Sequence, residues 1–364
     1  MIPHQSYAQI FRRFLHFGCL AWGGPIAQIA MIKKELVDEE KWIDVERFNR
    51  ALAVYQVLPG PEAHELCVYF GMLARGRMGA ILAGLGFMLP GFLLMFTISW
   101  IYLRFGISSP HATAAFTAVQ AAVVAIIFRA VHRIGNHALG HKWLWAVALL
   151  AFGWQLFSTQ AMVRMELDAG PLRTPAQREL FISGLKAGLL TFGGAYTAIP
   201  FIQHDAVEVG AWMTNRQFLD GLALSGMLPA PLIIFSTFVG YLGGGPLGAL
   251  LVTMGIFLPA FGFTLIGHDF FERIALNPRL RCVLDGITAG LVGMIAATAI
   301  QLAMVGVTSW STLAVFMCAL AALYRWNAKW VVAAVLASAA TFGLIFDPPS
   351  DITPTSVPTH RAGQ

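Results

Sequence analysis

Residues 58–65 read LPGPEAHE, and this short stretch decides how the surrounding chain can fold. Two prolines bracket a glycine inside an otherwise apolar region. Each proline removes a backbone donor and clashes with the preceding turn, so a helix cannot continue through the stretch unbroken. Three ionisable side chains follow within four residues. If the surroundings lie in a membrane, such a break has to face protein or water rather than lipid.

The composition indicates that the surroundings do lie in a membrane. Of the 364 residues, 57% are hydrophobic and 12% are charged, whereas a soluble domain carries roughly 25% charged residues. Several apolar blocks reach about 20 residues, enough to cross a hydrocarbon core of roughly 30 Å. These blocks are Met78–Tyr102, Ala112–Val131, Leu180–Ile202, Leu247–Ile266 and Gly286–Val307. We therefore expect an all-α polytopic membrane protein.

The rest of the composition argues against several other classes. A net charge of +5 in a membrane protein reports orientation and lipid contact, so we expect a lipid bilayer and no nucleic acid as partner. The four cysteines form no CxxC pair, and the histidines His132, His137 and His141 flank a predicted cytoplasmic helix end, so we expect no metal site. We find no nucleophile–base grouping, phosphate-binding loop or ATPase domain, and we expect neither an enzyme nor a cofactor.

The chain contains an internal repeat. A shift of 170 residues places Trp22-Gly23-Gly24 on Phe192-Gly193-Gly194, and LPGP at 58–61 on LPAP at 228–231. One residue drops out near position 70, after which the register is 169, and a weaker match at 168 pairs residues 120–124 with 288–292. A nearly constant register through two Gly-Gly and two Pro-x-Pro landmarks indicates two homologous halves.

These halves give the domain organisation. We assign residues 1–140 to the first repeat and 178–305 to the second. Residues 141–177 are predicted to form a short helix and a linker, and residues 306–346 a pair of short helices. The Pro- and Thr-rich residues 347–364 are predicted to be a disordered tail.

Each half has a short apolar segment on either side of its Pro-bracketed break. They are residues 48–58 and 63–74 in the first half, and 218–228 and 232–242 in the second. A dozen residues extend roughly 18 Å, too short to cross a membrane alone, so we expect each pair to form a re-entrant hairpin. Matched interrupted segments in two halves point to a transporter substrate site, while duplication for packing alone is the alternative.

Loop charges bear on the orientation of the halves. Residues 33–50 carry five Lys or Arg, whereas the matching residues 203–220 carry one. Farther along the bias reverses, and residues 273–281 of the second half are the richer in arginine. Under the positive-inside rule the halves therefore have opposite topology, as inverted repeats do. Arg12 and Arg13 argue against this scheme, because it places the N-terminus outside.

The breaks together predict an anion site between the halves. Glycine lets the backbone approach a ligand closely, and the start of a half-helix presents unpaired N–H groups and a positive dipole. Pro61 and Pro231 stand where a first helical residue is expected, so two helix N-termini aim at one place. The predicted substrate-binding residues are Gly23, Gly24, Pro25, Gln28, Gln56, Pro59, Gly60, Pro61, Gly193, Gly194, Ala195, Tyr196, Thr197, Pro229, Ala230 and Pro231.

A second set of residues is predicted to couple transport or to neutralise charge. Glu62 and Glu65 have no acidic counterpart in the second half, which favours an anion cradle with a one-sided proton or salt-bridge element over a symmetric cation site. His16 and Lys186 share one repeat position inside predicted membrane helices, where an ionisable residue is a functional candidate; snorkelling to an interface is the alternative. His64 completes this set of candidates.

The motifs resemble those of the chromate ion transporter family in its long, two-domain form. The first half is similar through FLHFGCLAWGGPIAQIAMIKKELV (14–37) and VLPGPEAHELCVYFG (57–71), and the second through LKAGLLTFGGAYTAIPFI (185–202) and LPAPLIIFSTFVGYLGG (228–244). The resemblance covers about residues 10–135 and 178–300. It implies a multi-pass transporter of the cell inner membrane that expels chromate using the proton motive force, with the isosteric sulfate as the natural competitor.

This sequence departs from the family pattern at four positions. Trp22 stands where Phe is usual, Leu228 where Thr is frequent, and His16 where Lys or Arg is common. Ala230 replaces the glycine of the second Pro-Gly-Pro. The departure at Ala230 concerns the predicted substrate site itself.

We therefore expect secondary active transport of an oxyanion, as chromate efflux driven by the proton motive force. One alternative is uptake or exchange of sulfate or another tetrahedral oxyanion. A second is a non-transporting membrane sensor or assembly protein, although a scaffold has no need of matched broken helices. Protons and a second copy of the chain, as a homodimer, are the further partners considered.

Overall fold

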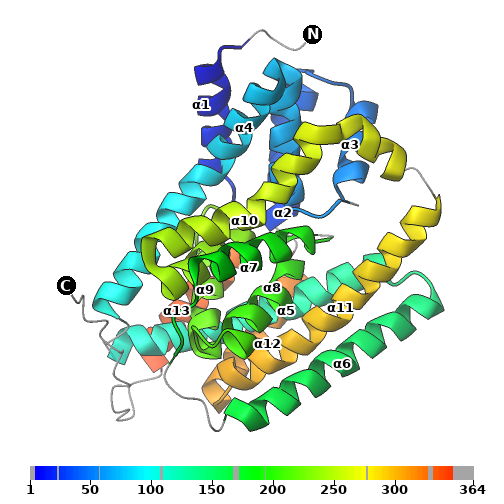
Figure 1. The fold of residues 1–364 in the computed structure, drawn as a ribbon. Helices are drawn as coiled ribbons and strands as arrows, with labels where there is room; N and C mark the ends of the chain where they lie inside the picture. The colour runs from blue at the N-terminus through cyan, green and yellow to red at the C-terminus, as the bar shows by residue number, and fades with distance from the viewer. Residues whose placement is uncertain are drawn as a thin grey trace.

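The computed structural model describes residues 5–22, 24–56, 58–106, 110–166, 172–275, 278–326 and 331–346. Figure 1 shows how its helices are arranged. In chain order they are α1 (Tyr7–Cys19), α2 (Gly24–Lys33), α3 (Val45–Tyr55), α4 (Glu62–Phe105), α5 (Pro110–Ala138), α6 (Lys142–Glu166), α7 (Gln177–Leu189), α8 (Ala198–Gln203), α9 (Asn215–Gly226), α10 (Phe235–Ala275), α11 (Pro278–Gly306), α12 (Trp310–Arg325) and α13 (Val331–Phe346).

The structure confirms an all-α membrane protein. Within the described residues, four helical stretches are long and apolar enough to cross a membrane: Glu62–Phe105, Ala112–Ala138, Leu232–Ile266 and Cys282–Gly306. Two of them belong to each half.

The sequence repeat is also a structural repeat. Each half contains a six-residue π-helical turn, η1 (Lys34–Glu39) or η3 (His204–Val209), at equivalent positions 170 residues apart. Two residues beyond each turn, Lys41 and Ala211 adopt positive φ angles of +53° and +48°. Residues other than glycine seldom do so. Its recurrence at equivalent positions shows that the two halves follow the same backbone path.

The long helices α4 and α10 each bend back on themselves. In α4 the bend lies at Gly76, with φ +62°, and in α10 at the equivalent Gly245, with φ +61°. Beyond the bend in α4, Gly79 packs so closely on Gly71 that a Cβ on either would clash with backbone, and the equivalent glycines of α10 do the same. Gly76 combines its positive φ with a ψ of −156°, a conformation that glycine adopts without strain. Close backbone packing then holds the two arms together.

In the first half, α3 and the first arm of α4 form a helical hairpin around the break. Phe48, near the start of α3, stacks on Phe70, near the end of the arm, with ring centroids 6.4 Å apart. Beside them, Arg47 Nε donates to Tyr69 Oη at 3.2 Å. Because the start of one helix meets the end of the other, the two run antiparallel. That both enter a membrane from the same side stays a prediction.

Helices α5 and α11 are equivalent and run in opposite directions. Val124 of α5 lies against Gly306 of α11, and Gly135 of α5 lies against Val292 of α11. Moving along α5 therefore means moving backwards along α11. A two-fold relation that exchanges two antiparallel helices has its axis across them. One half is therefore inverted relative to the other, as in many transporters built from repeats.

The last helix of each repeat packs on the other half. Helix α6 follows α5 in sequence but lies along α11, as Figure 1 shows, and α12 follows α11 but packs on α5. Gly293 lets α11 approach the α6 backbone at Ala148, and the rings of Phe128 and Phe316 join α5 to α12 at 5.5 Å. These crossed-over helices tie the two halves together.

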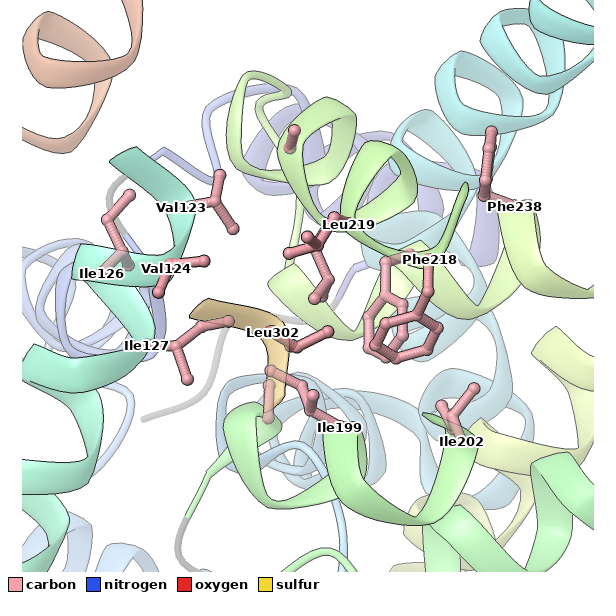
Figure 2. Packing of buried hydrophobic residues seen from close by; sticks show 14 of the residues in the cluster. Val123, Val124, Ile126, Ile127, Ile199, Ile202, Phe218, Leu219, Phe238 and Leu302 are labelled. Atoms are coloured by element: carbon pink, nitrogen blue, oxygen red, sulfur yellow. The ribbon is translucent and has the colours of Figure 1, made fainter. Parts of the chain in front are cut away.

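A buried core lies where α5, α8, α9 and α11 converge. Figure 2 shows side chains from all four helices gathered there. Val124, Ile127, Ile199, Leu219 and Leu302 are each at most 1% exposed. Lipid is as apolar as these side chains, so close van der Waals packing is what holds such helices together. This core fixes the second-half breaks against α5 and α11.

Two predicted segments take a different form in the structure. The apolar block Leu180–Ile202 is not one helix, since α7 ends at Leu189 and α8 begins at Ala198; the Gly-Gly pair at 193–194 interrupts it. Helix α6 has 25 residues and reaches Glu166, well into the segment assigned to a short helix and linker. The predicted disordered tail, 347–364, lies outside the described residues.

Candidate functional site

Both Pro-bracketed breaks lead directly into a helix start. Pro61 is the N-cap of α4, so the first helical residue is Glu62. Pro231 precedes a short 3₁₀ turn, η4 (Leu232–Ile234), that leads into α10. Each proline therefore stands one residue before the first helical position, not at it as the sequence predicted. The first turn after each proline still presents backbone N–H groups that have no carbonyl partner within the helix.

The first-half break meets the Gly-rich break of the second half. Gly60 N–H donates to the Thr191 carbonyl at 2.8 Å, and Thr191 precedes the FGGA motif by one residue. Gly60 has φ +152°, and a Cβ there would lie 2.8 Å from Glu65 Oε1. Only glycine fits these conditions. Breaks that are far apart in sequence thus share a backbone hydrogen bond.

Small residues allow each Pro-bracketed break to touch the long helix of the opposite half. A Cβ on Gly60 would stand 3.4 Å from the Cβ of Ala260, and a Cβ on Gly91 would stand 2.7 Å from that of Ala230. Positions 91 and 260 are repeat equivalents, as are 60 and 230. Each contact therefore pairs a glycine with an alanine. Gly91 makes the room that Ala230, the departure from the family pattern, requires.

The two second-half breaks also lie together. The 3₁₀ turn η2 (Ala195–Thr197) packs against η4. Ala195 and Ala230 are 2% and 6% exposed, and Pro231 is buried, whereas Pro229 is half-buried. The structure thus joins Gly60 of the first-half break to Thr191, next to the Gly-rich break of the second half, and packs residues 195–197 against the turn that follows Pro231.

The predicted polar side chains mostly brace the breaks. Gln28, 1% exposed, donates from Nε2 to the Ala21 carbonyl at 3.0 Å, and the buried Thr197 hydroxyl donates to the Gly194 carbonyl at 2.8 Å. Tyr196 is half-buried, whereas Gln56 is exposed at the end of α3. Gln28 and Thr197 thus stabilise the Gly-rich turns in which they lie.

The ionisable side chains after the first break are buried. Glu65 is 0% exposed, its Oε1 points at Gly60, and neither carboxyl oxygen has a hydrogen-bond partner among the described residues. His64, also 0% exposed, lies between aromatic rings, with the centroids of Phe257 and Phe261 both 4.8 Å away. Glu62 is half-buried at the helix start. A buried polar group without a partner is costly, which marks Glu65 as a functional candidate.

Two arginines at the site were not among the predicted residues. Arg133 of α5 is exposed and lies close enough to both Glu62 and Tyr196 to act on them electrostatically, and Arg129, one turn earlier, acts on Tyr196. From the sequence, such charges indicate only the orientation of the helices. Their place well inside the apolar helix 112–138 was the signal available. The two arginines put positive charge beside breaks from both halves.

The structure does not bring His16 and Lys186 to the breaks. Lys186, 43% exposed, pairs with Asp205 of η3 at 2.6 Å. The exposed His16 lies near Glu35 of η1, the equivalent of Asp205. Both side chains thus accompany the π-helical turns, and their coupling role stays a prediction.

Among the described residues, the WGGP break shares no hydrogen bond with the other three breaks. Gly24 and Pro25 open α2 and are half-buried, and nothing comes within 4 Å of a Cβ built on Gly24. Gly23 and Gly193 lie outside the described residues. By repeat symmetry, Ala230 N–H would donate to the Ala21 carbonyl; it donates instead to Leu228 at 2.9 Å.

Comparison with known proteins agrees with this architecture. A family model described as "Chromate transporter" matches residues 8–167 and 178–344, one match for each half. The chain belongs to the chromate transporter family. Each match includes the crossed-over helix of its half, α6 or α12, so both helices are part of the chromate transporter repeat.

Full-length relatives carry the same family name. A chromate transport protein of Pseudomonas aeruginosa is 51% identical, with 95% of this chain and 94% of the relative aligned. A chromate transport protein of Cupriavidus metallidurans is 28% identical over 95% of this chain and 94% of the relative. No solved structure matches the chain. The resemblance inferred from the motifs is therefore confirmed, and this member is a membrane transporter.

Proposed function

We propose that this protein is a secondary active transporter that exports chromate across the cell inner membrane, using the proton motive force. The observation that carries the proposal is the junction of breaks from inverted halves, joined by the Gly60–Thr191 hydrogen bond, with Arg133 alongside. The names of the relatives, chromate transport proteins, supply the choice of oxyanion.

The chemistry of the junction suits a tetrahedral dianion. The N-terminal turn after Pro61 offers backbone N–H groups and the positive end of a helix dipole. Arg133 and Arg129 add positive charge from α5, and a guanidinium can donate two parallel hydrogen bonds to an oxyanion. Arg133 belongs to the first half and Tyr196 to the second, so one anion here would contact both.

Glu65 gives a physical route to proton coupling. A charged carboxylate and a dianion in one buried site repel each other strongly in a low dielectric. We therefore propose that Glu65 is protonated while chromate occupies the junction. One proton carried with one dianion leaves a net charge of −1. The electrical part of the proton motive force, inside negative, drives this charge outward, while the pH part opposes the step because the proton also moves outward.

Substitution Glu65→Gln tests this coupling. The amide imitates the protonated carboxyl, so we expect chromate transport in this variant to lose its dependence on pH while keeping its substrate. The measurement is initial uptake into inverted vesicles between about pH 6 and 8, with Glu46→Gln, an exposed carboxylate on α3, as matched control. A Glu65→Gln profile identical to that of the wild type contradicts the role.

Transport itself is tested with radiolabelled chromate in inverted membrane vesicles. Energised vesicles containing the protein should accumulate chromate, and a protonophore should abolish accumulation. Excess sulfate should compete if a tetrahedral dianion is recognised by shape and charge. Sulfate accumulation in right-side-out cells, with no energised chromate accumulation in inverted vesicles, would show an importer instead.

A further inference from the structure

The two re-entrant hairpins are not packed alike. In the second half, α9 packs on α5 and α11, the antiparallel pair at the centre of the molecule. In the first half, α3 packs on α4 and α10, and it makes no packing of comparable extent with α5 or α11 among the described residues. Figure 1 shows α3 near the top of the view and α9 near its centre. Equivalent elements thus occupy different environments.

A buried carboxylate fixes α9 against the first half. Asp220 is 4% exposed; its Oδ2 accepts from the Tyr102 hydroxyl of α4 at 2.8 Å, and its Oδ1 accepts from Gln120 Nε2 of α5 at 2.6 Å. One turn earlier, Arg216 Nη2 donates to Thr117 Oγ1 of α5 at 3.4 Å. An ionisable group in this setting is a functional candidate by default, and the transport route described above does not use it.

The positions equivalent to Asp220 and Gln120 form no such latch in the structure. With offsets of 170 for α9 and 168 for α5, Asp220 corresponds to Arg50 and Gln120 corresponds to Thr288. Arg50 is 54% exposed and pairs with Glu46 on its own helix at 2.9 Å. Thr288 is half-buried on α11. The first hairpin therefore lacks the docking that the second one has. The breaks are also asymmetric but in the opposite sense, since Gly60 of the first half bonds across to Thr191 while Ala230 of the second half bonds within its own turn.

We propose that Asp220 is a positioning residue that latches the second hairpin onto the first half, and that the chain alternates with a state in which the first hairpin docks on α11. In that state Arg50 approaches Thr288, as Asp220 approaches Gln120 here. Because the halves are inverted relative to each other, the second state has the arrangement of the first with the two faces of the membrane exchanged. The link to transport rests on the proposed function, whereas the two docked states do not.

Cysteine reactivity tests the latch without any transport measurement. The full-length protein, with Cys19, Cys67, Cys282 and Cys318 replaced by serine or alanine, receives a reporter at Leu219→Cys, a fully buried position on α9. Asp220→Asn and Tyr102→Phe should each speed maleimide labelling of this reporter by at least tenfold. A reporter at Ala187→Cys, buried in α7, should keep its slow labelling.

Cross-linking tests the exchanged state. The pair Arg50→Cys with Thr288→Cys should form a disulfide slowly in the parent protein and at least fivefold faster when Asp220→Asn is added. Simple destabilisation of α9 would not bring α3 to α11, so this readout separates a latch from a packing role.

Clear outcomes overturn the proposal. If Leu219→Cys labels as slowly in both latch variants as in the parent, Asp220 does not hold the hairpin. If cross-linking at positions 50 and 288 is the same in both backgrounds, the exchanged state does not exist. Should Asp220→Asn also expose Ala187→Cys, and so unfold the protein, Tyr102→Phe, which removes one hydroxyl, decides the matter alone.

Discussion

The two Pro-bracketed breaks share a backbone but differ in chemistry. The first, at 58–61, is followed by Glu62 and the fully buried Glu65, and the second, at 228–231, by Leu232 and the fully buried Phe235. Both touch the long helix of the opposite half through a Gly–Ala pair. The two halves have therefore kept the same architecture but differ in chemistry. The first half has ionisable groups after its break, and the second half has apolar side chains at the equivalent positions.

The largest expected effect comes from filling the second of these contacts. Gly91→Ala places a methyl group 2.7 Å from the Cβ of Ala230, and overpacking of this kind costs about 1–3 kcal/mol. We expect a lower melting temperature in detergent, and we expect Ala230→Gly in the same chain to restore it. The control Ala260→Gly, at the equivalent position, should have a smaller effect. Failure of the double variant to recover would break the proposed complementarity of the two contacts.

A smaller and symmetric effect is expected at the hairpin bends. Gly76 and Gly245 have nearly the same positive φ, and nothing lies within 4 Å of a Cβ at either. Alanine at either position therefore meets no neighbour and costs only the unfavourable backbone conformation at positive φ, about 1–2 kcal/mol. Melting of Gly76→Ala and Gly245→Ala should show similar losses. A large loss at one bend and none at the other would mean that the bends are not equivalent in solution.

The smallest effect is expected at the π-helical turns. Lys186 makes a half-exposed pair with Asp205, whereas Arg13 contacts both Glu35 and Glu40 and lies over the Trp42 ring. Exposed pairs contribute about 0–1 kcal/mol, so Lys186→Met should destabilise little and leave chromate transport intact. Loss of transport in a folded Lys186→Met protein would instead support the coupling role predicted from its sequence position.

The sequence predicted the repeat, the breaks and the hairpins because proline and glycine act on the backbone locally. It also located Gly60, because the prolines on either side of it mark the break. It missed Arg133, because the charge of that arginine acts on Glu62 and Tyr196 only once α5 has packed across the molecule. The crossed-over packing of α6 and α12 was likewise invisible, since no local pattern specifies which half a helix covers. Contacts such as Asp220 with Gln120 depend on the inverted arrangement of the halves.

The central claim is that breaks from both halves enclose an oxyanion beside Arg133. Equilibrium binding of radiolabelled chromate to the purified protein tests it most directly. Hydrogen bonds to charged groups contribute about 1.5–3 kcal/mol, so Arg133→Gln should weaken binding roughly ten- to hundredfold. The matched control Arg173→Gln, which removes a guanidinium paired with Glu179, should bind like the wild type. Equal chromate affinity in Arg133→Gln and the wild type would contradict the account.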